Sequence, residues 1–452
     1  MATAGAVGRG MRRGLAVVAL GVSVVLLAAC SAGSGGGATV EAIGSHTDPR
    51  MPAAVATQLQ AVLANAVKLS GATGGVAGVW APWAGTWTTA TGTVSNEKGA
   101  PAVVADASFR IGSLTKPLSC TVLLDLAAAH KVGLEDEVSK YLPRMVGING
   151  LRLGDLCRNT SGLGDYWASL TPQLVTNPTR PWEALELVNS AMGSSGATSA
   201  AAKWEYSNAG FVLLGMALQA ATNTSWSQLY ATYVTAPLGI ADTTTYPSSG
   251  KLPSPTMSTY APDRNVVTGA LDCKVTDDES RLSPSALQQA GGIVSNLDDT
   301  ASLAHAVAAG TLLRSKTDAA EQQKAAPMSA SMPSWAGYGL GVEKMGPLIG
   351  HASAVPGTLT AAYSDPASGL TVVIMVNDSG PGANFARLAA LQLASIGSKA
   401  PARAGQKAPN ISLPWSASQL AQVLPHEAGC NAAKGALTNA GLKAIAAIQP
   451  SY

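Results

Sequence analysis

The chain has 452 residues, which is enough to bury one large hydrophobic core or two moderate ones. Charged residues make up only 12% of it and the formal net charge is +2, so charge gives no reason to expect a nucleic-acid partner. The mean hydropathy is slightly positive. After residue 30, however, no apolar run reaches the roughly 20 residues that cross a bilayer. We therefore expect a globular domain rather than a multispanning membrane protein.

The first 30 residues have the pattern of a secretory signal. Three arginines precede an almost wholly apolar stretch over residues 15–27. Cys30 follows Leu-Ala-Ala, which resembles the lipobox of bacterial lipoproteins, where this cysteine carries the lipid. The alternative is an ordinary signal peptide with an incidental cysteine. We expect a lipoprotein signal peptide over 1–29, a flexible tether over 30–51, and a lipid anchor at Cys30 on the outer face of the cytoplasmic membrane.

The predicted elements begin with a helix over residues 52–71, where apolar residues recur at helical spacing after a proline. Two short strands, 74–82 and 85–95, follow and are joined by a Pro/Gly turn. Next comes a core helix that begins with an apolar stretch at Cys120 and ends near Gly133. The region from about 134 to 285 is mostly helical and rich in loops.

Sheet-forming segments return near the C-terminus. A helical pattern runs from Ser285 to the end of the segment 297–313. Strands are predicted over 338–345, 357–365 and 370–378, and another helix over 384–396. Residues 397–452 read as a linker followed by a C-terminal helical extension. The pattern predicts an α+β fold in one domain over 52–396, with an antiparallel sheet flanked by helices and an inserted all-helical subdomain over about 134–285.

Ser113 and Lys116 are the first candidates for chemistry. The segment FRIGSLTKPLSC places them one helical turn apart, at the head of an apolar helix whose first N–H groups are free to bind an anion. Burial and the positive end of the helix favour the neutral form of the lysine, which can then take the serine proton. Pro117 disfavours helical angles at Lys116, but in a helix that begins at Ser113 it removes at most one early hydrogen bond.

The same Ser-x-x-Lys spacing occurs a second time, at Ser95 and Lys98. That copy lies in a polar turn, heads no helix and buries nothing. We therefore assign it no role.

Tyr206, Ser207 and Asn208 head a second apolar helix. A phenol near a lysine ammonium can have a lowered pKa and act as a base or proton relay. The amide of Asn208 can hold the lysine or donate to a substrate carbonyl. The alternative is an ordinary helix start, with Ser207 or Asn208 as its cap.

His351 lies at the end of a predicted strand, in GHASAVPGTLT. Three small residues and a Pro-Gly turn follow it, as at a strand edge that admits a ligand. A lone histidine is more often structural than catalytic.

Five segments in this order, FRIGSLTK, TSGLGDY, YSN, AGGIVSN and GHASAVPG, resemble the serine β-lactamase / D-Ala-D-Ala carboxypeptidase superfamily, which includes penicillin-binding proteins. The most similar branch comprises class C β-lactamases, soluble D,D-peptidases and family VIII esterases. The resemblance covers roughly residues 60–395. It implies that Ser113 is the acylated nucleophile and Lys116 the adjacent base.

The resemblance also implies roles for the other motifs. Tyr206 would protonate the leaving group and later activate water, and Asn208 would contact the substrate amide. His351 takes the place of a lysine or histidine that assists the substrate carboxylate or the tyrosine. The backbone N–H groups of Ser113 and Ala354 would form the oxyanion hole.

Two positions depart from the family pattern. The third motif reads His-Ala-Ser, and Ser353 stands where glycine is usual, so its side chain either narrows the substrate channel or offers an extra hydroxyl. Asn159 stands where relatives commonly have histidine, and the sequence offers no explanation for it.

Four cysteines follow Cys30, in a compartment that permits disulfides if the chain is exported: Cys120, Cys157, Cys273 and Cys430. Three pairings are possible, their spacing is unlike a zinc site, and buried free thiols are an alternative. The resemblance implies that the helices carrying Cys120 and Cys157 pack together, so we predict that bridge.

These observations together predict a membrane-tethered serine hydrolase that forms an acyl-enzyme. Its substrate would be a small acyl compound, namely a peptidoglycan stem peptide, a β-lactam or an ester, with slow ester turnover and little cleavage of nitrocefin. No metal or organic cofactor is indicated, because the proton transfers need none. The alternative is a catalytically silent binding lipoprotein on the same fold. A nucleophile-elbow hydrolase is excluded because no Gly-x-Ser-x-Gly occurs.

Overall fold

The computed structural model describes residues 49–195, 203–241, 244–264, 270–330 and 332–437, together with residues 439, 442 and 445. Cys30 and nearly all of the predicted signal peptide and tether lie outside the described residues. Within the described part of the chain, no helix combines the length and the apolar character needed to span a bilayer.

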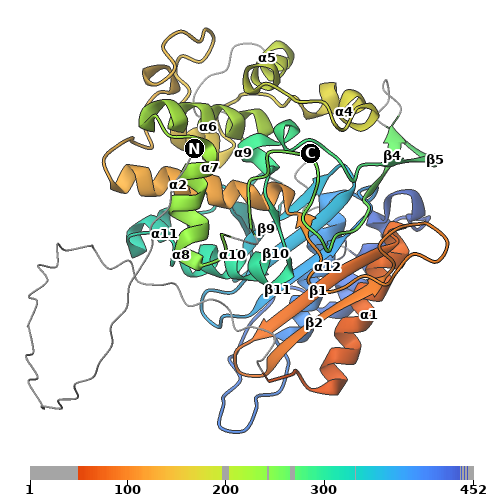
Figure 1. Cartoon of the computed structure of the whole chain (residues 1–452). Helices are drawn as coiled ribbons and strands as arrows, with labels where there is room; N and C mark the ends of the chain where they lie inside the picture. The colour runs from red at the N-terminus through yellow and green to blue at the C-terminus, as the bar shows by residue number, and fades with distance from the viewer. Residues whose placement is uncertain are drawn as a thin grey trace, which may run out of the picture. The chain divides into compact units, whose positions relative to one another are not determined.

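A seven-stranded antiparallel sheet forms the centre of the protein (Figure 1). Its strand order is β2-β1-β11-β10-β9-β8-β7, so strands from the two ends of the domain pair directly. These strands are β1 Gly74–Ala81, β2 Gly85–Gly92, β7 Ala336–Tyr338, β8 Glu343–Met345, β9 Leu348–Val355, β10 Thr358–Ser364 and β11 Thr371–Val376. Two separate pairs join β3 (Phe109–Arg110) to β6 (Val294–Ser295) and β4 (Tyr260–Arg264) to β5 (Leu271–Asp278).

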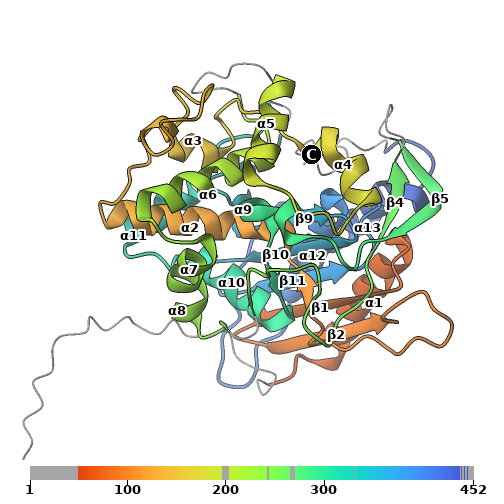
Figure 2. The same cartoon turned by 45° about the horizontal axis from the view of Figure 1, so that its top comes forward.

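Helices cover both faces of the sheet. One face carries α1 and α12, and the other carries α10 and the buried α2, while α3, α5 and α6 gather on the α2 side (Figure 2). The helices are α1 Ala53–Ser70, α2 Thr115–Ala128, α3 Leu153–Arg158, α4 Trp167–Thr176, α5 Ala184–Ser195, α6 Asn208–Thr222, α7 Trp226–Tyr230, α8 Ala236–Leu238, α9 Gln288–Gly291, α10 Leu297–Ala309, α11 Lys316–Gln323, α12 Ala383–Gly397 and α13 Ala417–Val423.

The apolar sequence of β11 follows from its place in the middle of the sheet. Val372, Ile374 and Val376 pack into the core on the α1/α12 side, whereas Val373 and Met375 pack into the core on the α2 side. Successive side chains of a strand point to opposite faces, so a strand covered on both faces favours an unbroken apolar run, here Val372 to Val376. This arrangement explains why a continuous apolar run predicted a strand there.

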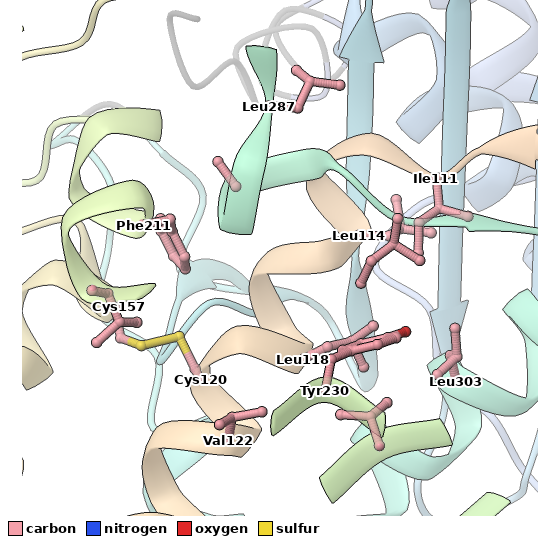
Figure 3. Close-up of a cluster of buried hydrophobic side chains, with 14 of the residues drawn as sticks. Ile111, Leu114, Leu118, Cys120, Val122, Cys157, Phe211, Tyr230, Leu287 and Leu303 are labelled. Carbon is pink, nitrogen blue, oxygen red and sulfur yellow. A yellow bond between two sulfur atoms is a disulfide. The ribbon is translucent and has the colours of Figure 1, made fainter. Parts of the chain in front are cut away.

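Two disulfides tie distant segments together. Cys120 on α2 is bonded to Cys157 on α3 inside the core (Figure 3), as the family resemblance predicted. Cys273 on β5 is bonded to Cys430 in the C-terminal segment. The C-terminal extension also places Trp415 in the α1/α12 core, and it is therefore packed against the domain rather than separate from it.

Removing the Cys273–Cys430 bridge is expected to lower the stability of the protein. The bonded residues are 157 positions apart, and the loop-closure entropy of such a bridge corresponds to about 3–5 kcal/mol of the free energy of unfolding. Urea unfolding of the double variant Cys273→Ser/Cys430→Ser, followed by circular dichroism, measures the change. An unchanged midpoint would mean that the Cys273–Cys430 bridge contributes nothing to the free energy of unfolding.

The predicted α+β fold class is confirmed, and the predicted helices and strands at both ends of the domain coincide with α1, β1, β2, β10, β11 and α12. Two details differ. The predicted insert over about 134–285 is not all-helical, because it contains the β4–β5 hairpin. His351 lies in the middle of β9 rather than at a strand end, because the strand continues through the small residues to Val355.

Candidate active site

Ser113 lies in a single turn of 3₁₀ helix, Gly112–Leu114, that leads directly into α2. Pro117 is therefore the third residue of α2, where a helix has no use for the backbone N–H that proline lacks. The hydroxyl of Ser113 lies 2.7 Å from the phenol oxygen of Tyr206 and accepts a hydrogen bond from Lys116 Nζ at 3.2 Å. The three side chains thus meet at one point, although Tyr206 is 93 residues away in the sequence.

Lys116 is fully buried, with its amine among three acceptors. Besides Ser113, it donates to Asn208 Oδ1 at 2.7 Å and to the Ala290 carbonyl at 2.9 Å. Burial lowers the pKa of Lys116 to about 7, against the opposing effect of the Asp165 and Glu343 carboxylates. The amine therefore changes protonation state near neutral pH, as a base for the serine proton requires.

Tyr206 and Asn208 reach this cluster from the start of α6. Ser207 between them is the N-cap of the helix, and its hydroxyl accepts from Gly210 N at 3.0 Å. The capping alternative therefore holds for Ser207, while its two neighbours contact Ser113 and Lys116.

The prediction of a lowered tyrosine pKa is wrong. Burial raises the pKa of Tyr206 well above its ordinary value, and the hydrogen bond with Ser113 only partly opposes this shift. The Lys116 amine lies over the ring of Tyr206, 4.6 Å from its centroid. The phenol is therefore protonated in the resting enzyme, and Lys116 is the group with a pKa near neutrality.

Two residues without an assigned role position the segment that carries Tyr206 and Asn208. Asp165 accepts from Asn208 N at 3.2 Å and from Asn208 Nδ2 at 2.8 Å, which turns the amide oxygen toward Lys116. Asn159 ends α3 in the left-handed conformation, with φ +57°, and its side chain accepts from Ser207 N at 3.1 Å. Asparagine tolerates this backbone conformation better than most residues, which explains physically why asparagine stands at position 159.

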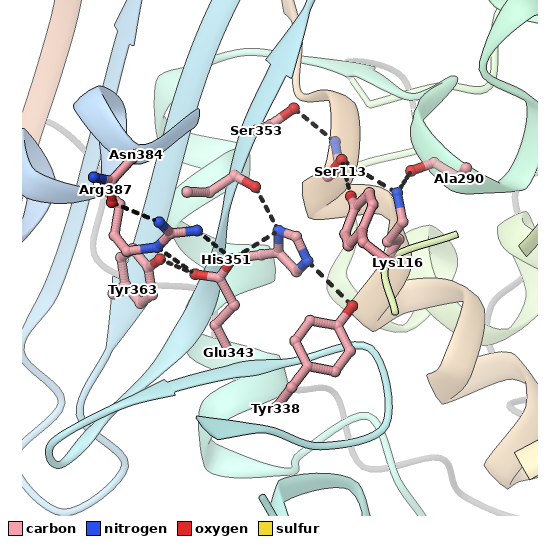
Figure 4. Close-up of polar contacts among 12 residues, drawn as sticks. Ser113, Lys116, Ala290, Tyr338, Glu343, His351, Ser353, Tyr363, Asn384 and Arg387 are labelled. Carbon is pink, nitrogen blue, oxygen red and sulfur yellow. Dashed lines mark hydrogen bonds and ion pairs between the residues drawn. The ribbon is translucent and has the colours of Figure 1, made fainter. Parts of the chain in front are cut away.

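His351 lies behind the cluster rather than in the cleft. It is 1% exposed, its Nδ1 contacts the Ala352 carbonyl, and its Nε2 lies 3.3 Å from the Tyr338 phenol (Figure 4). Burial lowers the pKa of His351 to about 4, although the Glu343 carboxylate opposes this. A buried, neutral ring gives no support to the predicted role of assisting a substrate carboxylate. The other predicted role, assisting Tyr206, stays a prediction, and the centroids of the two rings are 6.4 Å apart.

A buried ion pair lies on the far side of His351 (Figure 4). Glu343 on β8 accepts from Arg387 on α12 at 2.8 and 3.0 Å and also from the Tyr363 phenol. Burial acts to raise the pKa of Glu343, but the charge of Arg387, joined below about pH 4 by that of protonated His351, holds it at about 2. The pair links the sheet to α12 and places a carboxylate oxygen 3.7 Å from His351 Nδ1.

The cleft at Ser113 has an uncharged lining. It is formed by Ser113, Trp167, Tyr206, Asn208, Leu287, Ala290, Gly291, Ala354 and Val355. Of the predicted strand residues, Ala354 lies in this lining, while Ser353 is buried and contacts the backbone of Ser113. Among the described residues, no group of His, Cys, Asp and Glu is arranged to hold a metal ion.

Comparison with known proteins places this site in a family. The model of the beta-lactamase family matches residues 59–395, about three quarters of the chain. The chain belongs to the beta-lactamase family. Its membership confirms the predicted superfamily and the predicted class, a serine hydrolase.

Several members of the beta-lactamase family are similar to this chain in sequence or structure. The D-alanyl-D-alanine-carboxypeptidase/endopeptidase AmpH of Escherichia coli (strain K12) is 36% identical over 32% of this chain and 38% of its own length. Penicillin-binding protein 4* of Bacillus subtilis is 29% identical over 30% of each chain. The chain thus matches only about a third of the length of each of these two relatives.

Solved structures match over more of the chain. A D-stereospecific amidohydrolase from a Streptomyces species is 28% identical, with a TM-score of 0.62 over 72% of this chain and 94% of the other. The D-amino acid amidase of Ochrobactrum anthropi shares the fold, with a TM-score of 0.63 at 23% identity.

Proposed function

We propose that the protein hydrolyses small, uncharged amides or esters through an acyl-enzyme on Ser113. The observation that carries this proposal is the contact of three groups in one buried cluster. The hydroxyl of Ser113 lies 2.7 Å from the Tyr206 phenol and 3.2 Å from the Lys116 amine. A nucleophile, a base with a pKa near neutrality and a protonated acid are the parts that acyl transfer needs.

The proposed acylation begins when neutral Lys116 takes the proton of Ser113 as Oγ attacks the substrate carbonyl. The resulting oxyanion would be held by the backbone N–H groups of Ser113 and Ala354. Tyr206 then gives its proton to the departing amine or alcohol, and the ammonium of Lys116 stabilises the phenolate. In deacylation the phenolate takes a proton from water as the hydroxide attacks, and Lys116 returns its proton to Ser113 Oγ.

The preference for uncharged substrates follows from the lining of the cleft. Trp167, Leu287 and Val355 are apolar, and none of the lining residues is Lys, Arg or His. His351 is buried, and its low pKa keeps it neutral at pH 7. A free carboxylate next to the scissile bond would thus lose its hydration without gaining a fixed cation there.

Three substrates test this proposal: a neutral p-nitrophenyl ester, an N-acetyl-D-amino acid amide and an N-acetyl dipeptide ending in D-alanine with a free carboxylate. We expect kcat/KM for the ester and the amide to exceed that for the dipeptide by at least about tenfold, since one unpaired charge costs more than 1.4 kcal/mol. A fluorophosphonate probe should label Ser113. A preference for the dipeptide would contradict the proposed preference for uncharged substrates. The absence of both labelling and turnover would favour the alternative, a catalytically silent binding protein.

We also propose that the protein is exported and lipid-anchored at Cys30. The signal-like first 30 residues support this, and so do the two disulfides, which persist mainly outside the cytoplasm. Cys30→Ala is expected to abolish incorporation of labelled palmitate in cells, whereas the neighbouring Ser31→Ala should keep it. Equal labelling of both variants would place the lipid elsewhere.

A further inference from the structure

The side chain of Ser353 makes a contact that the proposed mechanism does not use. Its hydroxyl oxygen accepts a hydrogen bond from the backbone N–H of Ser113 at 2.8 Å (Figure 4). This N–H lies at the very start of the turn that leads into α2, where backbone donors have no partner inside the helix. It is also one of the two N–H groups that would hold the oxyanion.

The backbone before the nucleophile leaves room for this contact. A Cβ atom added at Gly112 would lie 2.0 Å from Ser353 Oγ and 2.8 Å from Val355 Cγ1, so only glycine allows the hydroxyl to come this close. Gly112 also has φ +53°, in the left-handed region that glycine favours. The contact therefore depends on both sides of the site, with Gly112 in the turn before α2 and Ser353 on β9.

We propose that Ser353 is a specificity-determining residue whose hydroxyl occupies the Ser113 oxyanion donor in the resting enzyme and must be displaced by the substrate carbonyl. One N–H makes one strong hydrogen bond, so the carbonyl oxygen and the serine hydroxyl compete for it. Ser353 is 1% exposed, so water is poorly placed to bond to its hydroxyl once the hydroxyl has lost the Ser113 N–H. This inference rests on the proposed function.

The competition selects among acyl donors. A substrate whose carbonyl oxygen carries much negative charge, as an amide does, displaces the hydroxyl more readily than an ester with a weakly basic carbonyl oxygen. Removing the hydroxyl should therefore accelerate acylation most for the ester. The gain is about the rate equivalent of one net hydrogen bond, about 3- to 10-fold.

The test measures the acylation rate of Ser353→Ala and Ser353→Gly in the purified protein, by stopped-flow with a p-nitrophenyl ester and by fluorophosphonate labelling. Thr360→Ala is the matched control, because Thr360 faces Ser353 on the neighbouring strand and its hydroxyl bonds to the Arg110 carbonyl instead. We expect both Ser353 variants to acylate about 3- to 10-fold faster than the wild type, and the control to stay within twofold. Amide hydrogen exchange of the peptide containing Ser113 should also accelerate in both Ser353 variants, and not in Thr360→Ala.

Slower acylation in Ser353→Ala would overturn the inference, because the hydroxyl would then act as an oxyanion donor. Equal rates with unchanged hydrogen exchange would overturn it as well. In both of those cases the wild type is labelled, so the proposed function stands. If neither the wild type nor the Ser353 variants are labelled, the proposed function fails and this inference fails with it.

Discussion

Replacing Ser113 by alanine is expected to lower kcat/KM for a neutral ester by about 10⁴-fold or more, down to the level that binding and the oxyanion hole supply on their own. The hydroxyl is the atom on which Lys116 and Tyr206 converge, and nothing else in the cleft lining replaces it as a nucleophile. Labelling by fluorophosphonate should disappear together with turnover. Steady-state kinetics and intact-mass analysis of the probe-treated protein measure both effects.

The chain provides its own control for this experiment. Ser95 and Lys98 repeat the Ser-x-x-Lys spacing in an exposed turn, where the Ser95 hydroxyl accepts a hydrogen bond from Glu97 N. Ser95→Ala should leave kcat/KM and labelling unchanged. If the probe labelled Ser113→Ala as fast as the wild type, another residue would be acylated. The assignment of Ser113 as the nucleophile would then be wrong.

The two copies also illustrate what sequence spacing can and cannot predict. Both have serine and lysine three residues apart, and only the apolar sequence after Ser113 indicated burial. That signal was sufficient because the apolar residues of α2 are not confined to one face, and the helix is buried from Thr115 to Leu126. The strand β11 was predictable for the same reason, since its apolar run reflects coverage on both faces.

Properties that depend on the surroundings of a side chain were not predictable. The protonation of Tyr206 follows from its burial, which the three-residue motif Tyr-Ser-Asn does not indicate. His351 matched the family pattern, but its position in the site depended on Glu343 and Arg387 behind it, on β8 and α12. Asp165 was within a quoted motif, and its role became apparent only through its bonds to Asn208, 43 residues later.

The β4–β5 hairpin was missed for another reason. The central residues of β5 are exposed, so β5 lacks the alternation of apolar and polar residues that marks a half-buried strand. Its position is fixed instead by pairing with β4 and by the bond from Cys273 to Cys430. Neither the pairing nor the disulfide produces a recognisable pattern in the sequence of β5 itself.

The pH dependence of the reaction distinguishes which group is the base. If neutral Lys116 takes the serine proton, kcat/KM should rise with pH through an apparent pKa of about 7 and then level off, because the ammonium form present at lower pH has no lone pair. Asp165, which is buried with a raised pKa, faces Lys116 and titrates together with it, so the observed value belongs to the pair. Glu343 and His351, with pKa values of about 2 and 4, do not change charge between pH 6 and 9.

A phenolate base would give a different profile. Burial raises the pKa of Tyr206 well above 10, so activity limited by phenolate formation would still be rising at pH 10. Tyr206→Phe should therefore lose about 10²–10⁴-fold in kcat/KM as a missing general acid and yet keep the rise near pH 7. Lys116→Ala should lose a comparable or greater factor together with that rise, while Lys98→Ala should keep both. A rise near pH 7 that survives in Lys116→Ala would remove the lysine from the role of base, because no other group in contact with Ser113 Oγ has a pKa near neutrality in the described part of the chain.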